Sequence, residues 1–501
     1  MDYNSYSAIT RCAASACPLK GTAFLWTPKH TKMTQHEFDV VVVGGGIAGL
    51  STANRAAQQG LKVAVLERGE GPQYLCNSRY SGGVLHISMH NAKDPAEKLI
   101  EVINHATSNK ADPELARALA TTAGRAIDWL QAEGAKYIRV GNIVWQQHVL
   151  APPRPIVAGL DWKGRGPDVT LRQLVTNLDK RGGKMFRLPA VTLMEREGRC
   201  IGVEAGDGAG KQQFHARAVV LADGGYQGNP ALVREHMGID FAKVKTRGAG
   251  TGIGDGMRMA RAMGAQFSEL KYFYGHMLSR DSFTNDKVWP YPQLDELGTV
   301  GIVVNDAGER FVDEGLGGVY VANTIARLAD PLSAWAILDH AIWEGPGRTA
   351  RIPANPQLAN AGGTIIRADT LAELAAKTGI VAERLEATVR GYNEALAGGK
   401  TASLAPTRSA QPIVPSPVNK PPYYALPLCA GMTYTFGGIF TDGNARVMST
   451  RGAPIEGLYA VGATTGGLEG GSNGGGYVGG LIKGVSFGMR AAEHIAQSLK
   501  A

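Results

Sequence analysis

A glycine-rich turn between two short apolar segments constrains the fold of this chain more than any other feature. Residues 38–50 read as a buried strand that leads through the turn into a helix, and residues 62–66 read as a second buried strand. Strands that are apolar throughout are typical of a parallel sheet covered on both faces. The order of strand, helix and strand therefore predicts a β-α-β unit at the start of an α/β domain.

Three glycines of this turn indicate a bound dinucleotide. Gly44 permits the tight turn, Gly46 lets the backbone approach a pyrophosphate, and Gly49 lets the helix pack closely on the strand. The N-terminus of the helix then presents free N–H groups and a partial positive charge to the phosphates. Glu67, which is followed by Arg68, ends the second strand and can accept hydrogen bonds from a ribose. The sequence therefore predicts a dinucleotide site.

FAD and NAD share this pattern, so the choice between them rests on three later segments. Residues 77–83 (Asn-Ser-Arg-Tyr-Ser-Gly-Gly) follow the second strand, residues 222–225 (Ala-Asp-Gly-Gly) end a later strand, and residues 457–462 end the last one. At this order and spacing, the segments resemble the flavoprotein subunit family of fumarate reductase and succinate dehydrogenase. Within that family the chain is similar to the soluble single-chain branch that includes tricarballylate and 3-ketosteroid dehydrogenases. The most telling local match is the segment 308–314, Gly-Glu-Arg-Phe-Val-Asp-Glu.

The resemblance implies a Rossmann-like FAD-binding domain with an inserted α+β cap domain, and a substrate held between the two. We expect the FAD-binding domain over residues 37–272 and 420–501 and the cap domain over residues 273–419, where turns, prolines and amphipathic helices alternate. Residues 1–36 read as a leader or as a spurious extension of a protein that starts at Met33.

The resemblance also implies which residues hold the cofactor. FAD is expected to be bound without a covalent link, because residues 77–83 contain no histidine to match the one that carries the flavin in membrane-complex members. Asp255 is expected near the ribityl chain or the flavin ring. The full set of expected contacts is Gly44, Gly46, Gly49, Glu67, Arg68, Ser78, Ser81, Gly82, Gly83, Asp223, Gly224, Asp255 and Gly462.

The implied reaction is hydride transfer between flavin N5 and a carbon beside a carbonyl or carboxyl group, which interconverts CH–CH and C=C. It needs a proton-transfer group and a stabiliser for an enolate-like oxygen. This sequence departs from fumarate reductase, because the arginines expected in residues 315–320 and 471–477 are absent, and Thr433 or Tyr434 replaces a histidine. Without these arginines, a small dicarboxylate is a poor candidate substrate.

Tyrosines stand near the altered positions. Tyr320, Tyr434 and Tyr477 could donate a hydrogen bond to a ketone oxygen or remove a proton, or each could be a core aromatic residue. His276 occupies the position of a substrate-binding histidine, although it could equally be an ordinary interdomain histidine. Nothing near it has the spacing of metal ligands. Arg310 and Glu314, from the matched segment 308–314, are expected to form a structural pair that bridges cap and flavin domain.

Composition limits the partners. The net charge of +8 is dispersed, so we expect no nucleic-acid partner, and no apolar run reaches the length of about 18 residues that a membrane helix needs. The cysteines include no Cys-x-x-Cys pair, which favours a reducing, cytoplasmic location over a disulfide framework. They are Cys12, Cys17, Cys76, Cys200 and Cys429.

The predicted partners are therefore a small-molecule substrate and a separate electron acceptor or donor, because the sequence carries no heme or ferredoxin motif. Three alternatives to a dehydrogenase stay open. They are an enoate reductase similar to fumarate reductase, a flavin oxidase or hydroxylase on the same scaffold, and a flavin-binding subunit whose site has lapsed.

Overall fold

The computed structural model describes residues 33–470 and 475–500. Residues 34–501 form one compact unit. Residues 1–32 of the expected leader, with Cys12 and Cys17, lie outside the described part, and the first strand, β1 (Thr34–Val43), starts directly after Met33.

The first sheet has eight strands and carries the glycine turn. β1 pairs in parallel with β2 (Val63–Leu66) and with β10 (Gln212–Leu221), so Val40–Val43 lie between two other apolar strands. This arrangement confirms the predicted β-α-β unit. The sheet order is β17-β18-β10-β1-β2-β7, and β8 and β9 extend it beside β10. The bounds of these other strands are Lys184–Phe186 (β7), Ala190–Arg196 (β8), Arg199–Ala205 (β9), Arg446–Met448 (β17) and Pro454–Ala460 (β18).

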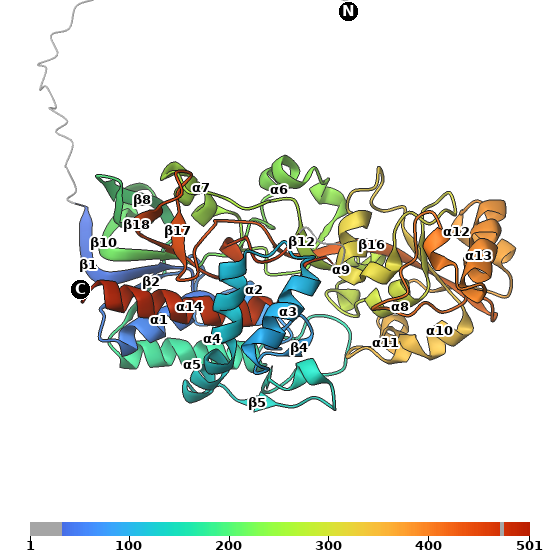
Figure 1. Ribbon diagram of the computed structural model, residues 1–501, viewed down its shortest axis with the longest axis horizontal. Coiled ribbons are helices and arrows are strands. Elements are labelled where there is room, and N and C mark those ends of the chain that lie inside the picture. The colour runs from blue at the N-terminus through green and yellow to red at the C-terminus, as the bar shows by residue number, and fades with distance from the viewer. Residues whose placement is uncertain (1–32, 471–474, 501) are drawn as a thin grey trace, which may run out of the picture. The chain divides into compact units, whose positions relative to one another are not determined.

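The two faces of this sheet are buried against different layers, as the alternation of side chains along a strand requires. Val40 and Val42 of β1 point into a core shared with the helices, whereas Val41 and Val43 point into the core on the other face. The helices of the first layer lie together below the sheet in Figure 1. They are α1 (Ile47–Gln58), α4 (Pro113–Ala132), α5 (Gly166–Lys180) and α14 (Gly480–Ser498).

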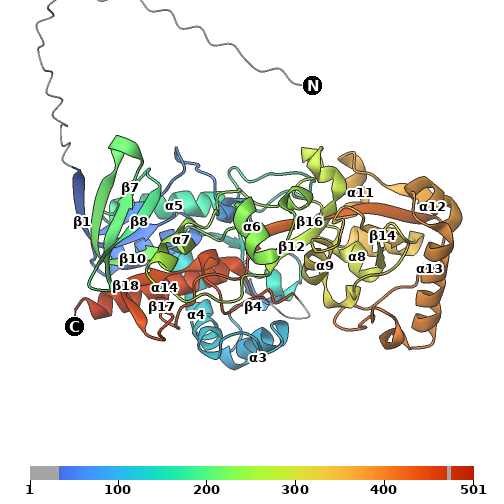
Figure 2. The ribbon, with the colours of Figure 1, turned by 90° about the horizontal axis from the view of Figure 1, so that it is seen from above.

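The second sheet has six strands, and its longest strand is β16 (Tyr423–Thr435), which Figure 2 shows running from the first sheet region into the second. β16 pairs antiparallel with β12 (Phe273–Ser279), which places Tyr274 opposite Tyr434 and His276 opposite Gly431. The other strands are β11 (Lys245–Thr246), β13 (Ile302–Val304), β14 (Trp335–Leu338) and β15 (Ile366–Ala368).

Six helices accompany the second sheet: α8 (Asp295–Val300), α9 (Gly318–Ile325), α10 (His340–Glu344), α11 (Ala354–Asn360), α12 (Leu371–Thr378) and α13 (Ala382–Ala397). β16 belongs to this sheet although it follows residue 419, where the cap domain was expected to end. The expected domain boundaries stay predictions. The mixed helix and strand architecture confirms the predicted α/β class with a second α+β region.

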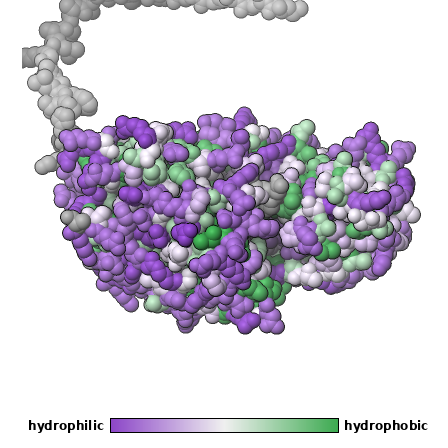
Figure 3. All heavy atoms as spheres, viewed as in Figure 1, coloured by the Kyte–Doolittle hydropathy of each residue, from purple (hydrophilic) through white to green (hydrophobic). Residues whose placement is uncertain are grey.

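Short elements and linking helices complete the fold. They are α2 (Asn77–Tyr80), α3 (Ala96–Ala106), α6 (Pro230–Met237), α7 (Asp255–Ala262), β3 (His86–Ile87), β4 (His90–Asn91), β5 (Tyr137–Ile138) and β6 (Val149–Leu150). In the part of the chain that the structure describes, no helix has the length and apolar character needed to cross a bilayer. Figure 3 shows a mostly hydrophilic face, with apolar residues gathered where the two sheet regions meet.

Candidate active site

A cavity of about 1120 Å³ extends from the glycine turn of the first sheet to strands β12 and β16 of the second. Every residue expected at the cofactor except Gly49 lines it: Gly44, Gly46, Glu67, Arg68, Ser78, Ser81, Gly82, Gly83, Asp223, Gly224, Asp255 and Gly462. These residues are distant in sequence, and folding gathers them around one cavity.

The three glycines of the turn have different surroundings. Gly44 has a φ of +104°, and a Cβ there would lie 2.5 Å from the carbonyl oxygen of Ala222. A Cβ on Gly49 would lie 2.0 Å from the carbonyl oxygen of Gly44, so this glycine serves helix packing and does not line the cavity. A Cβ on Gly46 would meet only Ser78 Oγ, at 3.4 Å. The space beside Gly46 is thus open to the cavity, as a pyrophosphate requires.

Two acidic residues lie at this nucleotide end. The buried Glu67 is held by the backbone, since its Oε2 accepts from Gly45 N at 2.7 Å and its Oε1 accepts from Gly69 N at 2.7 Å. Asp255 forms an ion pair with Arg68, with 3.1 Å between Oδ2 and Nη1. Arg68 follows Glu67 at the end of β2, so Asp255 lies close to the glycine turn, and its place near the ribityl chain or flavin ring stays a prediction.

Asp223 provides an unsatisfied acceptor in the cavity wall. Its Oδ2 accepts from Gly256 N at 2.7 Å, but its Oδ1 has no hydrogen-bond partner among the described residues. Burial raises the pKa of Asp223 to about 6. A cofactor hydroxyl that donates to Oδ1 would satisfy this acceptor. The open cradle at Gly46 and the free acceptor of Asp223 both fit FAD.

Aromatic residues gather at the other end of the cavity. The rings of Tyr274 and Tyr477 are stacked with centroids 4.0 Å apart, and Tyr434 lies 5.2 Å from Tyr274. We call these three residues the tyrosine cluster. His276 Nε2 lies 2.8 Å from the hydroxyl of Tyr274, and His276 Nδ1 is hydrogen-bonded to Asp295. A hydrogen-bonded chain therefore runs from a carboxylate through an imidazole to a phenol.

The electrostatics of the cluster favour hydrogen-bond donors over bases. Burial raises the pKa of Tyr274 and that of Tyr477, and burial with nearby Glu469 raises the pKa of Tyr434. The hydroxyl of Tyr434 donates to Glu469 Oε1 at 2.9 Å, and Glu469 is paired with Lys483. The phenols therefore stay protonated at neutral pH and can stabilise a developing oxyanion.

His276 is also uncharged at neutral pH. Burial lowers its pKa and outweighs the opposing effect of Asp295. A neutral imidazole between an acid and a phenol can pass a proton without a change in net charge. His276, for which the sequence left a substrate-binding role and an ordinary interdomain position open, lines the wall of this cavity.

Tyr320 does not join this group. It lies on α9 and packs against the hydrophobic core of the second sheet, whereas Leu316, Gly317, Gly318 and Val319 line the cavity. The structure therefore gives no support to the predicted proton-transfer role of Tyr320.

Three arginines that sequence reasoning missed line the cavity. Arg154 and Arg247 lie over the ring of Tyr291, with guanidinium carbons 4.5 and 4.8 Å from its centroid. Arg351 Nη1 donates to the carbonyl oxygen of Gly82 at 3.2 Å. We call Arg154, Arg247 and Arg351 the arginine wall. The two arginines expected in residues 315–320 and 471–477 are absent from the sequence, and long-range folding brings these three arginines to the cavity from other segments.

Two further acidic or basic groups were missed because no motif marks them. Glu296 follows Asp295 at the start of α8, and its Oε2 has no partner in the described chain. Burial, and then the charge of Asp295, raises the pKa of Glu296 to about 7. His86 lies with Nε2 3.3 Å from the hydroxyl of Tyr477, and burial lowers its pKa to about 4.

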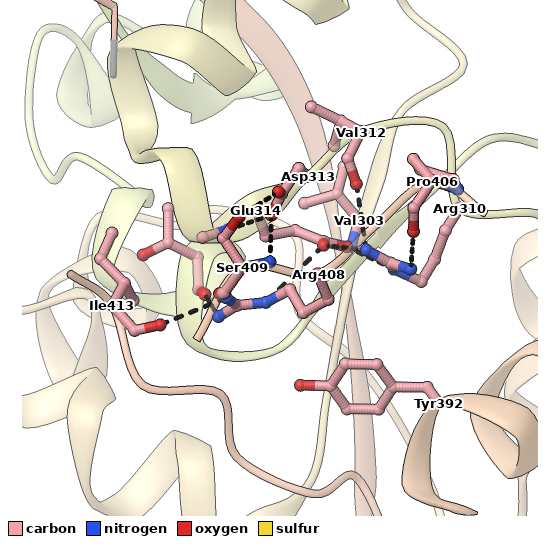
Figure 4. Close-up of polar contacts among 12 residues, drawn as sticks. Val303, Arg310, Val312, Asp313, Glu314, Tyr392, Pro406, Arg408, Ser409 and Ile413 are labelled. Atoms are coloured by element: carbon pink, nitrogen blue, oxygen red, sulfur yellow. Dashed lines mark hydrogen bonds and ion pairs between the residues drawn. The ribbon is translucent and has the colours of Figure 1, made fainter. Parts of the chain in front are cut away.

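The predicted pair of Arg310 and Glu314 is present, as Figure 4 shows, with 3.0 Å between Nε and Oε1. Arg310 also donates to the carbonyl oxygens of Val312 and Pro406, and Glu314 accepts from Val303 N. All of these partners belong to the second sheet region. The pair therefore stabilises this region internally, and the expectation that it bridges to the flavin domain is corrected.

Arg408 extends the same network toward the cavity. It is fully buried, lies 3.8 Å from Glu314, and donates to the carbonyl oxygens of Thr299 and Ile413. Residues 411–413 line the cavity. Arg408 therefore fixes the loop that forms this part of the wall.

Comparisons with known proteins agree with this geometry. A family model described as an FAD binding domain matches residues 39–478. The fumarate reductase (cytochrome) of Shewanella frigidimarina is 28% identical, over 92% of this chain and 77% of the relative. The 4-oxocyclohexanecarboxylate 2-dehydrogenase of Sinomonas cyclohexanicum is 28% identical, over 88% of each chain. The predicted resemblance to the fumarate reductase flavoproteins is confirmed.

A solved structure shares the fold. The 3-ketosteroid Δ1-dehydrogenase of Sterolibacterium denitrificans superposes with a TM-score of 0.70 at 22% identity, and the match covers 92% of this chain and all of the other. The matched family model, which describes an FAD binding domain, spans most of the sequence, and the residues that line the cavity fit FAD. The chain therefore belongs to the FAD-binding domain family and is an FAD-dependent oxidoreductase.

Proposed function

We propose that this chain interconverts CH–CH and C=C bonds beside a ketone or carboxyl group. The observation that carries the proposal is the tyrosine cluster, which shares one cavity with the glycine cradle and is hydrogen-bonded to His276 and Asp295. The two relatives named above are a reductase and a dehydrogenase, which is consistent with chemistry at such a bond.

Each part of the site has a role in this proposal. When bound, FAD supplies the hydride chemistry. Tyr477 donates a hydrogen bond to the carbonyl oxygen that becomes enolate-like, and its raised pKa keeps the donor protonated. Tyr434, whose hydroxyl donates to Glu469, forms the wall beside it. Tyr274 exchanges the proton of the neighbouring carbon, and His276 and Asp295 replace it through the hydrogen-bonded chain.

The remaining parts of the proposal concern the setting of the enzyme. FAD is held without a covalent bond, as residues 77–83 contain no histidine. Electrons pass to or from a separate partner. A cytoplasmic location is supported by Cys76, Cys200 and Cys429, which are free thiols.

Anaerobic reduction of the flavin tests the reaction. The holoenzyme is mixed with saturated cyclic ketones and saturated carboxylic acids, and loss of the visible flavin absorbance is followed with recovery of the unsaturated product. Bleaching with that product supports the proposal. Reduction only by amines or alcohols, with rapid reoxidation by oxygen, would instead identify an oxidase on the same scaffold.

Matched tyrosine variants test the roles. Tyr477→Phe should retain FAD and lower kcat about 10- to 1000-fold, because one oxyanion donor is removed. Tyr320→Phe is the control, since Tyr320 does not line the cavity, and its rate should be unchanged. The reverse pattern would remove Tyr477 from the proposed role.

A further inference from the structure

We propose that the arginine wall binds a carboxylate group of the substrate, so that the enzyme acts on carboxylic acids in preference to neutral ketones. This inference rests on the proposed function and names its substrate class. Arg154, Arg247 and Arg351 all line the cavity that holds the tyrosine cluster.

The charge balance of buried arginines singles out this wall. Among the described residues, Arg79, Arg310 and Arg408 are buried with a carboxylate within ion-pair distance. Arg154 and Arg247 are also buried, yet neither forms an ion pair with any described residue, and both line the cavity. A buried cation without a counter-ion is costly, so its presence in a cavity indicates an anionic ligand.

Part of the hydrogen-bonding capacity of the wall is also unused. Arg154 is only 6% exposed, and its Nη1 and Nη2 have no partner in the described chain. The buried Nη2 of Arg351 has none either. A guanidinium presents paired N–H donors whose spacing matches a carboxylate, so these nitrogens suit bidentate binding.

Tyr291 shows how strongly positive this part of the cavity is. Burial alone would raise the pKa of its phenol, but the adjacent cations of Arg247 and Arg154 outweigh burial and lower it. Both guanidinium groups lie against the ring face. The cations therefore act together on one point of the cavity.

The wall lies beside both the cofactor cradle and the tyrosine cluster. Arg351 is anchored to Gly82 of the predicted FAD-binding segment. Arg247 Nη1 donates to Thr433 Oγ1 at 3.1 Å, and Thr433 immediately precedes Tyr434. A substrate whose carboxylate binds the arginine wall would therefore extend into the space between the cradle and the tyrosine cluster. The proposed reaction requires its reacting bond to lie in this space.

Binding to the oxidised holoenzyme tests this inference without turnover. Two matched pairs of probes are titrated, fumarate with fumaramide and trans-cinnamate with cinnamamide, and the perturbation of the flavin spectrum gives each Kd. Each acid should bind at least about 10-fold more tightly than its amide, because only the acid makes charge-assisted hydrogen bonds. Equal affinity within both pairs would overturn the inference.

Variants assign the effect to the wall. Arg154→Gln and Arg351→Gln should each weaken acid binding by about 10- to 100-fold and leave amide binding unchanged. Arg348→Gln is the control, because Arg348 lies three residues from Arg351 but pairs with Glu344 on the surface. Loss of FAD from both wall variants would show that the wall serves the cofactor, which would also overturn the inference.

Thermal unfolding of the ligand-free holoenzyme separates a binding role from a structural one. Arg154→Gln should not lower Tm, because it removes an unpaired buried charge, whereas Arg408→Gln should lower Tm because it leaves Glu314 with one partner fewer. A large drop in Tm for Arg154→Gln would mark it as structural. Acids that bind at the wall but never reduce or oxidise the flavin would refute the proposed function alone.

Discussion

Gly46 and Gly49 lie three residues apart, but an added side chain would have opposite effects at the two positions. At Gly46 it would enter the open cavity, whereas at Gly49 it would collide with the backbone of Gly44. We therefore expect Gly46→Val to yield a folded protein without flavin, and Gly49→Val to yield little folded protein. Visible absorbance and circular dichroism distinguish these results. A yellow Gly46→Val protein would contradict the placement of the pyrophosphate.

Glu296 makes stability depend on pH. Its pKa rises from 4.5 to about 7 on folding, so the folded protein keeps a proton that the unfolded chain has released. The stabilisation that comes from this retained proton is fully present below the pKa of Glu296 in the unfolded chain. It is lost as the pH rises through the pKa of Glu296 in the folded protein. Glu296→Gln should therefore be more stable than the wild type above about pH 8, by up to about 3 kcal/mol, and show no such gain below about pH 4.

Urea unfolding of the two proteins across this pH range measures the difference. Glu386→Gln, at an exposed position of α13, is the control. The difference in free energy of unfolding between this variant and the wild type should be the same across the pH range. If Glu296→Gln were more stable than the wild type by the same free energy of unfolding at every pH, the carboxyl of Glu296 would not have the raised pKa that we expect in the folded protein.

At the scale of elements, the pairing of β12 with β16 positions the tyrosine cluster. A Cβ on Gly275 of β12 would lie 2.2 Å from the carbonyl oxygen of Gly431 on β16. Gly275→Ala should force the strands apart and disturb Tyr274 and His276, which flank it. We expect a lower Tm and a loss of turnover with FAD content retained, because the cradle lies on other elements.

Gly391→Ala provides the matched control for this strand pair. Gly391 lies within α13, and an added Cβ meets no atom within 4 Å. The substitution should raise the free energy of unfolding by about 1 kcal/mol, as expected for glycine to alanine in a helix, with turnover unchanged. If both variants behaved alike, the effect of Gly275→Ala could not be assigned to the strand pairing.

The sequence predicted the elements whose signals are local. The unit of β1, α1 and β2 was readable because its glycines and apolar runs lie within residues 34–66. β16 was not predicted, because its partners β12 and β14 lie far upstream in the chain and because Pro427 and Gly431 inside it are residues that usually interrupt a strand. The arginine wall was missed for the same reason, since each of its members looks like any other arginine until folding removes it from water.

At the scale of the whole molecule, the cavity is lined by both sheet regions, so the cofactor should stabilise the chain as a unit. Protein stripped of FAD should unfold at a lower temperature. Restoring FAD to about 100 times its Kd should add about 2.7 kcal/mol to the free energy of unfolding. Calorimetry with and without FAD checks this expectation, and Gly46→Val should show no gain from added FAD.

The shared cavity also determines the order in which the substrate and the electron acceptor or donor can bind. The cradle, the tyrosine cluster and the arginine wall open into one space, so a small molecule that exchanges electrons with the flavin there must occupy the volume that the first reactant has left. The two half-reactions then alternate, and neither reactant can be bound while the other is in place. A high concentration of either reactant should therefore inhibit turnover, because that reactant then occupies the cavity when the other one needs to bind.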